Sequence, residues 1–263
     1  MTIHLKIKDK NGNILYEKTG ENAVSFVYHA EYNEGDMIVL ETISANKHIV
    51  WQVDDALGCA MCYATGSVAY QIPFDEKKKV YSPKTFSGNK HYIWARIAEK
   101  NEITAYRNLS VNVNDQHDVD TCFPHATANV ETRGESVFAA RNAIDGIVEN
   151  HGHGLWPYTS WGINRDPNAE MKIDFGRKVA VDCLKVYLRA DFPHDSWWTK
   201  ATVTFSDGSK EVLEFVKTDG GQTFHIAERE VEWLAFGNLI KAEDESPFPA
   251  LTQFEVYGKD ISV

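Results

Sequence analysis

The most restrictive feature of this sequence is a series of short segments in which apolar and polar residues alternate, separated by turn residues. The clearest case in the first half is 4–8, and further strand-like segments there are 14–16, 24–28, 37–43, 48–53, 67–72, 91–97 and 109–113. Alternation of this kind is the period of a half-buried strand. An Asn-Gly step at positions 11 and 12 indicates a hairpin. Because no long helical pattern interrupts the series, residues 1–114 are predicted to form an antiparallel β-sandwich.

The second half continues in the same way, so the predicted fold class is all-β with two β-sandwiches. Its strand-like segments are 170–175, 181–188, 201–205, 211–215, 222–226, 231–236 and 252–258. Residues 138–143 are expected to form one short helical turn. Residues 115–121 are polar and lack periodicity, which favours a linker. We therefore expect a second, jelly-roll-like domain over 122–263.

Length and charge exclude several classes of function. The chain has 263 residues, enough for two ordinary domains, and its net charge is −11. An acidic chain is a poor partner for nucleic acid and for an anionic membrane surface, so neither partner is expected. No apolar run approaches the roughly 20 residues that span a bilayer. The start of the chain alternates like a strand and does not read as a secretory signal, so a cytoplasmic location is expected. The oligomeric state is left open.

Four cysteines occur, at positions 59, 62, 122 and 183. Cys59 and Cys62 form the one close pair, and a structural zinc site would need a second pair at similar spacing. Reduced thiols in or near a β-hairpin are therefore expected, with a metal site or a disulfide as the alternative.

Aromatic, histidine and glycine residues gather between positions 141 and 176, and a second polar and aromatic loop follows at 189–198. Sugar recognition needs flat aromatic faces for the C–H face of the ring and fixed polar groups for the hydroxyls. The candidate ligand-binding residues are His151, His153, Trp156, Tyr158 and Arg165 in the first loop, and Arg189, Asp191, His194 and Trp197 in the second. Trp197 and Trp198 are adjacent and point to opposite sides of an extended chain, so at most one of them is expected to meet a ligand.

Three segments of the second half carry a family resemblance. An Asp-Gly turn at 143–146 precedes Thr159-Ser160-Trp161, a strand at 172–176 ends in Asp-Phe-Gly, and a closing strand occupies 253–258. In this order and spacing they resemble the discoidin, or coagulation-factor type C, group of galactose-binding-like modules, over about residues 122–259. The resemblance implies an eight-stranded sandwich that binds sugars or similar ligands through loops at one end. It also implies that Trp161 belongs to the core.

Many members of that group hold one structural calcium ion beside the first turn. The positions that the resemblance implies as ligands are Asn142 by its carbonyl, Asp145 by its carboxylate, Thr159 by its hydroxyl, and Thr252 and Gln253. Relatives usually carry glutamate where Gln253 stands, and the loss of a carboxylate weakens a calcium site. The alternative is that Asp145 caps the turn by accepting backbone N–H groups.

The function predicted from these residues is non-catalytic carbohydrate binding by loops at one end of the second sandwich. One alternative is a glycan-processing enzyme that uses either a transition metal at His151, His153 and His194 or a pair of carboxylates. No HExxH or Gly-x-Ser-x-Gly motif supports an enzyme. Another alternative is a protein-interaction module, which would expose a large apolar patch.

Overall fold

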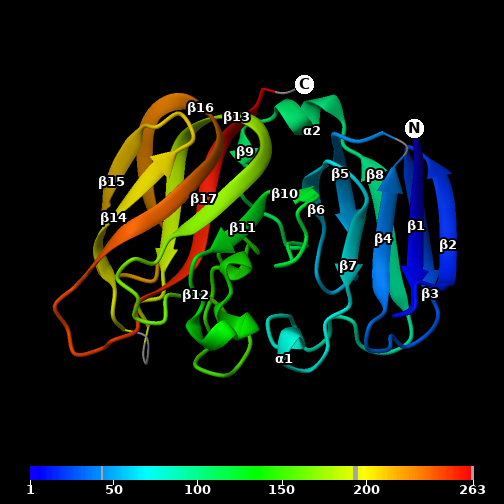
Figure 1. Ribbon diagram of the computed structural model, residues 1–263, viewed down its shortest axis with the longest axis horizontal. Coiled ribbons are helices and arrows are strands. Elements are labelled where there is room, and N and C mark those ends of the chain that lie inside the picture. Colours follow the sequence, from blue (N-terminus) through cyan, green and yellow to red (C-terminus); the bar gives the residue numbers. More distant parts are fainter. Residues whose placement is uncertain (43, 192–194, 262–263) are drawn as a thin grey trace.

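A computed structural model describes residues 1–42, 44–191 and 195–261 as two lobes of antiparallel sheets that lie side by side (Figure 1). The predicted all-β fold class is confirmed. The first lobe contains two facing sheets, with strand orders β2-β1-β4-β7 and β10-β6-β5-β8-β3. Their bounds are β1 Thr2–Lys8, β2 Ile14–Glu21, β3 Ala23–Tyr28, β4 Met37–Thr42, β5 Lys47–Gln52, β6 Ala60–Ala64, β7 Val68–Gln71, β8 His91–Ile97 and β10 Cys122–Phe123.

Alternation determines which face of each strand is buried. Along β1, Ile3, Leu5 and Ile7 are fully buried while the residues between them are partly exposed. Trp51 on β5 is also fully buried, in the core that the two facing sheets enclose. The period of two therefore builds this sandwich directly from the sequence.

Two short helices and one loop depart from the sequence prediction. Helices α1 (Asp75–Lys78) and α2 (Lys100–Thr104) occupy segments without a helical pattern. The predicted strand at 109–113 is wrong, because the ladder ends after β9 (Arg107–Asn108). Side chains replace the ladder there: Ser110 Oγ donates to the carbonyl of Phe254 at 2.8 Å, and Asn112 Nδ2 donates to that of Pro124 at 2.9 Å.

The second lobe contains one eight-stranded sheet with the path β12-β17-β13-β16-β14-β15, to which β11 and β9 are added at β13 and β17. Its strands are β11 His125–Ala128, β12 Trp161–Gly162, β13 Met171–Leu188, β14 Trp198–Phe205, β15 Lys210–Glu214, β16 Gln222–Lys241 and β17 Ala250–Asp260. Three 3-10 turns, η1 (Thr132–Gly134), η2 (Ser136–Phe138) and η3 (Ala140–Ala143), precede β12. They agree with the helical turn expected at 138–143.

Long strands in this lobe join segments that the sequence separates. Strand β13 unites the predicted strands at 170–175 and 181–188, and β16 unites those at 222–226 and 231–236. Register shifts between Asp174 and Val179 mark where the pairing of β13 with β16 is interrupted. Such irregularities bend a strand without ending it. The expected core position of Trp161 is confirmed, since its side chain is fully buried against Trp198 and Phe236.

The two lobes share strands and an apolar cluster. Strand β9 pairs with β17 of the second lobe, while β10 pairs with β6 of the first. Within the predicted linker, the buried Asp115 accepts from His125 Nδ1 at 2.7 Å, and its carbonyl accepts from Arg141 Nε at 2.7 Å. Phe138 and Tyr158 belong to the same buried cluster as Tyr81. The domain boundary at 115–121 stays a prediction, and the chain crosses between the lobes more than once around it.

The cysteines are as expected from their spacing in the sequence. All four cysteines are free thiols, and Cys62 lies on β6 of the β5–β6 hairpin. Among the described residues, no helix has the length and apolar character needed to cross a membrane.

Candidate functional site

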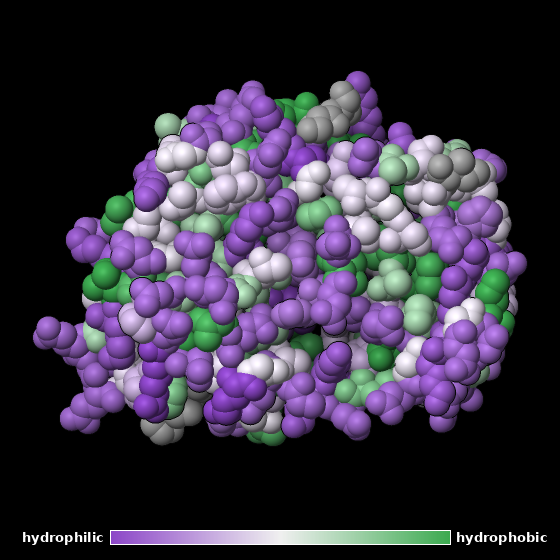
Figure 2. Space-filling view, viewed as in Figure 1, coloured by the Kyte–Doolittle hydropathy of each residue, from purple (hydrophilic) through white to green (hydrophobic). Residues whose placement is uncertain are grey.

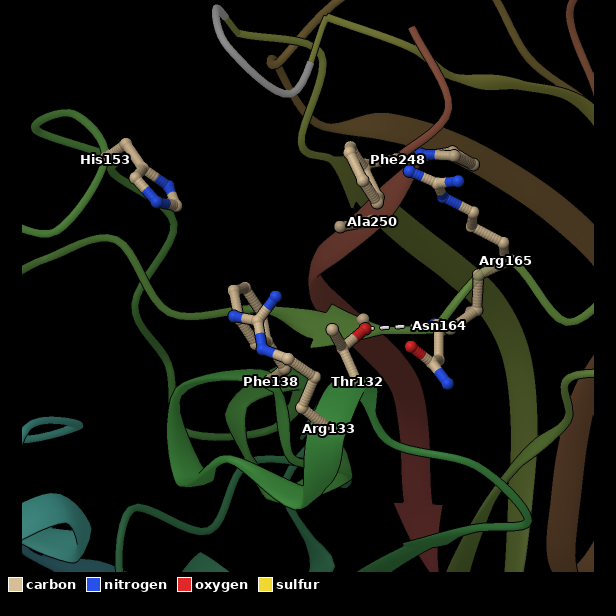
Figure 3. A pocket seen from close by; sticks show the side chains of 11 residues that line it. Thr132, Arg133, Phe138, His153, Asn164, Arg165, Phe248 and Ala250 are labelled. Atoms are coloured by element: carbon tan, nitrogen blue, oxygen red, sulfur yellow. Dashed lines mark hydrogen bonds between the residues drawn. The ribbon is translucent and has the colours of Figure 1, made fainter.

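A hollow of about 280 Å³ opens at one end of the second lobe, where η1, the turn after β12 and the start of β17 meet (Figure 3). Its volume is near the lower end of the roughly 300–1,000 Å³ typical of small-molecule sites. The residues that line it are Thr132, Arg133, Phe138, His153, Gly162, Ile163, Asn164, Arg165, Phe248, Pro249 and Ala250. The hollow therefore has room for a ligand of about the size of one sugar ring.

Two phenylalanines and two arginines give the hollow its chemical character. The guanidinium of Arg133 lies over the Phe138 ring with a carbon-to-centroid distance of 5.5 Å, and that of Arg165 lies 4.4 Å over the Phe248 ring. Figure 3 shows these two pairs on different sides of the hollow, with His153 on a separate loop facing them. Apolar surface and hydrogen-bond donors are thus presented together, as a sugar site requires.

A close backbone approach holds η1 and η2 against β12. A Cβ atom placed on Gly162 would lie 2.7 Å from Thr132 Oγ1 and 3.2 Å from the Phe138 ring, so glycine is needed here. The Thr132 hydroxyl accepts the backbone N–H of Asn164 at 2.9 Å, which the dashed line in Figure 3 marks. This bond joins the wall that carries Arg133 to the wall that carries Arg165.

Arg165 also faces a second hollow, of about 330 Å³, on the side of β14 and β16. The two hollows share Ile163, Arg165 and Pro249. The second one is lined by charges of both signs, including Lys241 and Asp244, which form an ion pair at 2.6 Å. The side chain of Arg165 is therefore available to ligand groups on either side of it.

Of the first-loop candidates, His153 and Arg165 line the hollow. His151 is exposed, and its backbone N–H donates to the carbonyl of Pro157 at 2.7 Å. Trp156 is half-buried, with an indole N–H that is buried without a hydrogen-bond partner. Tyr158 is only 8% exposed and packs in the cluster shared with the first lobe, so its ring is not open to a ligand.

The second-loop candidates lie outside the hollow where the structure describes them. Arg189 is fully buried; it donates to the Tyr158 carbonyl and to Asp191 Oδ1, the latter at 3.0 Å. Its role in this structure is to fix the two loops to each other. Trp197 is half-buried and packs against the core of the second lobe. His194 lies outside the described residues.

Several lining residues were not among the sequence candidates. Arg133, Phe138 and Phe248 come from segments that carry no cluster of aromatic or histidine residues. One usable signal was present: Phe248 stands between Pro247 and Pro249 in a polar stretch, and such an aromatic residue has no strand or helix in which to be buried. No local pattern in the sequence marks Arg133, because only the folding of the chain brings it to the hollow.

The five residues that the resemblance implies as calcium ligands are all buried. Asp145 Oδ1 accepts the N–H of Ile147 at 2.8 Å, as expected for a capping residue, while Oδ2 has no hydrogen-bond partner. The hydroxyl of Thr159 also lacks a partner. Burial raises the pKa of the Asp145 carboxyl to about 7, against the lowering effects of the Arg141 charge and the Ile147 N–H. Oxygen atoms left over in this way fit a hard cation such as Ca²⁺.

The side-chain oxygens of Gln253 and Thr252 are already hydrogen-bonded, although Gln253 Nε2 is buried without a partner. Gln253 Oε1 accepts the N–H of Gly146 at 3.2 Å, and Thr252 Oγ1 accepts Asn150 Nδ2 at 3.2 Å. The carboxamide of Asn142 donates to the carbonyl of Ser136 at 2.8 Å. No group of three or more His, Cys, Asp or Glu side chains arranged to hold a metal occurs in the described ranges. Asp145 therefore supplies the one carboxylate of the implied set.

No protein-family model and no curated protein matches this sequence. Among solved structures, the chain is similar to chitosan-binding module 1 of a chitosanase/glucanase from Paenibacillus sp. IK-5, with 19% identity and a TM-score of 0.41 over 58% of this chain and 99% of that one. It is similar to a fucose-binding module of Streptococcus pneumoniae, with 14% identity and a TM-score of 0.42 over 59% and 96%.

A family 32 carbohydrate-binding module of C. perfringens NanJ, solved in complex with galactose, shows 16% identity and a TM-score of 0.38 over 50% of this chain and 91% of that one. These neighbours are carbohydrate-binding modules of the galactose-binding-like fold. Likeness at this level does not assign a ligand to this chain.

Proposed function

We propose that this protein binds a carbohydrate in the hollow at the end of its second lobe. The observation that carries the proposal is the pairing of aromatic and cationic side chains around one cavity of about 280 Å³. Phe248 is 39% exposed at the mouth, which leaves part of its ring for the C–H face of a sugar. Arg165, Asn164 and His153 supply the polar groups that read ring hydroxyls.

Binding without catalysis is the form of the proposal that the site supports. Phe138, Ile163 and Ala250 give a ligand an apolar surface to pack on, and none of the described residues that line the hollow is a carboxylate. Glycoside hydrolysis by paired acids needs two carboxyl groups across the bound sugar. On the face shown in Figure 2, apolar residues are scattered among hydrophilic ones, and an interaction module would instead favour one large apolar patch.

A glycan array followed by calorimetry tests the proposal on the full chain. We expect binding to at least one glycan, and a loss of affinity of about tenfold in Phe248→Ala, equivalent to ~1.4 kcal/mol. The matched control is Tyr92→Ala, because Tyr92 is 45% exposed on β8 of the other lobe. Absence of binding to any glycan, or equal affinity of Phe248→Ala and the unmodified chain, would contradict the proposal.

We further propose that a Ca²⁺ ion beside the first turn stabilises the fold, held by Asp145 and Thr159. The support is the unpartnered Asp145 Oδ2 and Thr159 Oγ1 atoms. A ligand that binds only the folded state at one hundred times its Kd stabilises by about 2.7 kcal/mol. We expect CaCl₂ to raise the melting temperature of the unmodified chain and not that of Asp145→Asn. Equal melting temperatures in EDTA and CaCl₂ would refute this part of the proposal.

A further inference from the structure

Three residues that line the hollow hold a backbone conformation that L-residues seldom adopt. The described residues include eight non-glycine positions with positive φ, and Arg133 (55°), Asn164 (49°) and Arg165 (61°) are three of them. Asparagine tolerates this conformation, but it is unfavourable for arginine, whose Cβ crowds the backbone at positive φ. Backbone strain of this kind gathers at ligand sites, where it is retained because it places a side chain.

The turn at 163–166 shows how positive φ places the Arg165 side chain. The N–H of Asp166 donates to the carbonyl of Ile163 at 2.8 Å, so Asn164 and Arg165 are the two central residues of a tight turn, both at positive φ. Turns of this type favour Asn followed by Gly. Arginine at the second position makes the turn less favourable and directs a guanidinium over the Phe248 ring, 4.4 Å from its centroid.

The charge of Arg165 is left for a ligand. None of the described carboxylates forms an ion pair with it, and no aspartate or glutamate lines the hollow. Arg133, in contrast, is already bound by both oxygens of Glu135, at 2.6 and 2.8 Å. A cation beside an apolar wall, with an uncommitted guanidinium fork, is suited to a carboxylate or a sulfate.

We infer that the ligand class of this hollow is an acidic sugar, whose anionic group is bound by Arg165 while the ring packs on Phe248 and Ile163. The inference rests on the proposed carbohydrate binding and narrows it to sugars that carry a carboxylate or a sulfate. The net charge of −11 opposes anions at long range. At physiological ionic strength the screening length is about 8 Å, so a guanidinium in contact outweighs distant carboxylates.

The test uses ligands that differ in one group. Calorimetry with the full chain compares each hexuronic acid with its parent hexose, in the gluco, galacto and manno configurations, and galactose 6-sulfate distinguishes sulfate from carboxylate. We expect one acidic member to bind at least tenfold more tightly than its neutral parent, and this preference to weaken as NaCl rises to 1 M, where screening reaches about 3 Å.

The matched variants separate a role in binding from a role in folding. Arg165→Gly is expected to lose the acidic preference by tenfold or more, with a melting temperature equal to or above that of the unmodified chain, because glycine relieves the positive φ. Arg133→Gly is expected to lose less, because Glu135 already neutralises that charge. Lys100→Gln, an exposed charge on α2, controls for the change in net charge.

Three outcomes of these experiments would contradict the inference. Equal binding of acid and parent hexose, with or without Arg165, overturns the acidic class while carbohydrate binding stands. Failure of every acidic ligand also overturns it, and the glycan array then decides separately whether any sugar is bound. A lower melting temperature in Arg165→Gly with an unchanged preference would show that the arginine serves the fold, which again overturns the inference.

Discussion

The carboxyl group of Asp145 is buried in surroundings that disfavour its charged form. Its side chain is buried, one oxygen is bonded to the Ile147 N–H, and the other has no partner. The Arg141 guanidinium lies 4.0 Å away and only partly offsets the loss of hydration. A carboxyl in such surroundings stays protonated to a higher pH in the folded state than in the unfolded chain.

The stability of the protein should therefore depend on the protonation of Asp145. Asp145 has a pKa of about 7 when folded and about 3.8 when unfolded, so the unfolded chain loses its proton first as pH rises. The free energy of unfolding in EDTA should therefore fall as the pH rises, by on the order of 2–3 kcal/mol between pH 5 and pH 8. Asp145→Asn removes this dependence and should be the more stable protein at pH 8. Urea unfolding at pH 5 and pH 8 measures the difference.

The control compares the pH dependence of stability in Asp145→Asn with that in the unmodified chain. If Asp145→Asn loses as much stability as the unmodified chain between pH 5 and pH 8, other groups cause the loss and the Asp145 carboxyl is not protonated near neutral pH.

Short elements of the first lobe support the hollow of the second. Ser136 at the start of η2 donates its N–H to Glu76 Oε1 at 2.8 Å and its hydroxyl to the Glu76 carbonyl at 2.9 Å. Glu76 lies on α1, and η2 ends at Phe138, which forms part of the wall. Figure 1 shows α1 beneath the junction of the two lobes. Although the hollow belongs to the second lobe, its position depends on the first.

Glu76→Ala should consequently weaken ligand binding although Glu76 is absent from the hollow. Glu76→Ala keeps the backbone carbonyl but removes Oε1, which accepts both the N–H and the hydroxyl of Ser136. The Ser136 N–H is then left unsatisfied, which costs about 1–3 kcal/mol, and the segment that carries Phe138 and Arg133 is held less firmly. We expect a several-fold loss of affinity in calorimetry and a lower melting temperature. Glu17→Ala, an exposed glutamate on β2, is the matched control. Unchanged affinity in Glu76→Ala would mean that the η1–η2 wall holds its shape without α1.

The two lobes are also joined by a buried cluster of charges. Asp260 at the end of β17 accepts from His48 Nε2 on β5 at 2.7 Å and from the Nε of Arg177 on β13. The side chain of Asp260 is fully buried. Despite burial, its pKa is lowered well below its usual range by the hydrogen bond from His48 and by Arg177. Together with the exchanged strands β9 and β10, this cluster makes the lobes depend on each other.

The melting behaviour of the chain follows from this arrangement. We expect one cooperative transition in scanning calorimetry, and Asp260→Asn should lower its midpoint by roughly 10 °C, because breaking a buried ion pair costs about 3–5 kcal/mol. Replacement of the exposed Asp219 by asparagine controls for the removal of one negative charge. Two separate transitions, with only one of them shifted, would show that the lobes are stabilised independently.

Local patterns in the chain were enough to predict the fold class. A period of two is set by the backbone of each strand, so it appears within a few residues, as in β1 and β8. The buried position of Trp161 followed from the motif around it. The strand expected at 109–113 failed because Ser110 and Asn112 bond to other parts of the chain, a choice that no local pattern displays.

The site required the three-dimensional arrangement, because its walls come from segments near 132–138, 162–165 and 248–250 that are distant in sequence. The composition of their loop made His153 and Arg165 candidates, and both line the hollow. The same reasoning could not tell Arg165 from Arg189, since both are arginines beside aromatic residues. Packing buries Arg189 between two loops and leaves Arg165 exposed on a strained turn. Residue types fix which chemistry is available, and contacts between distant segments fix which side chains remain free to use it.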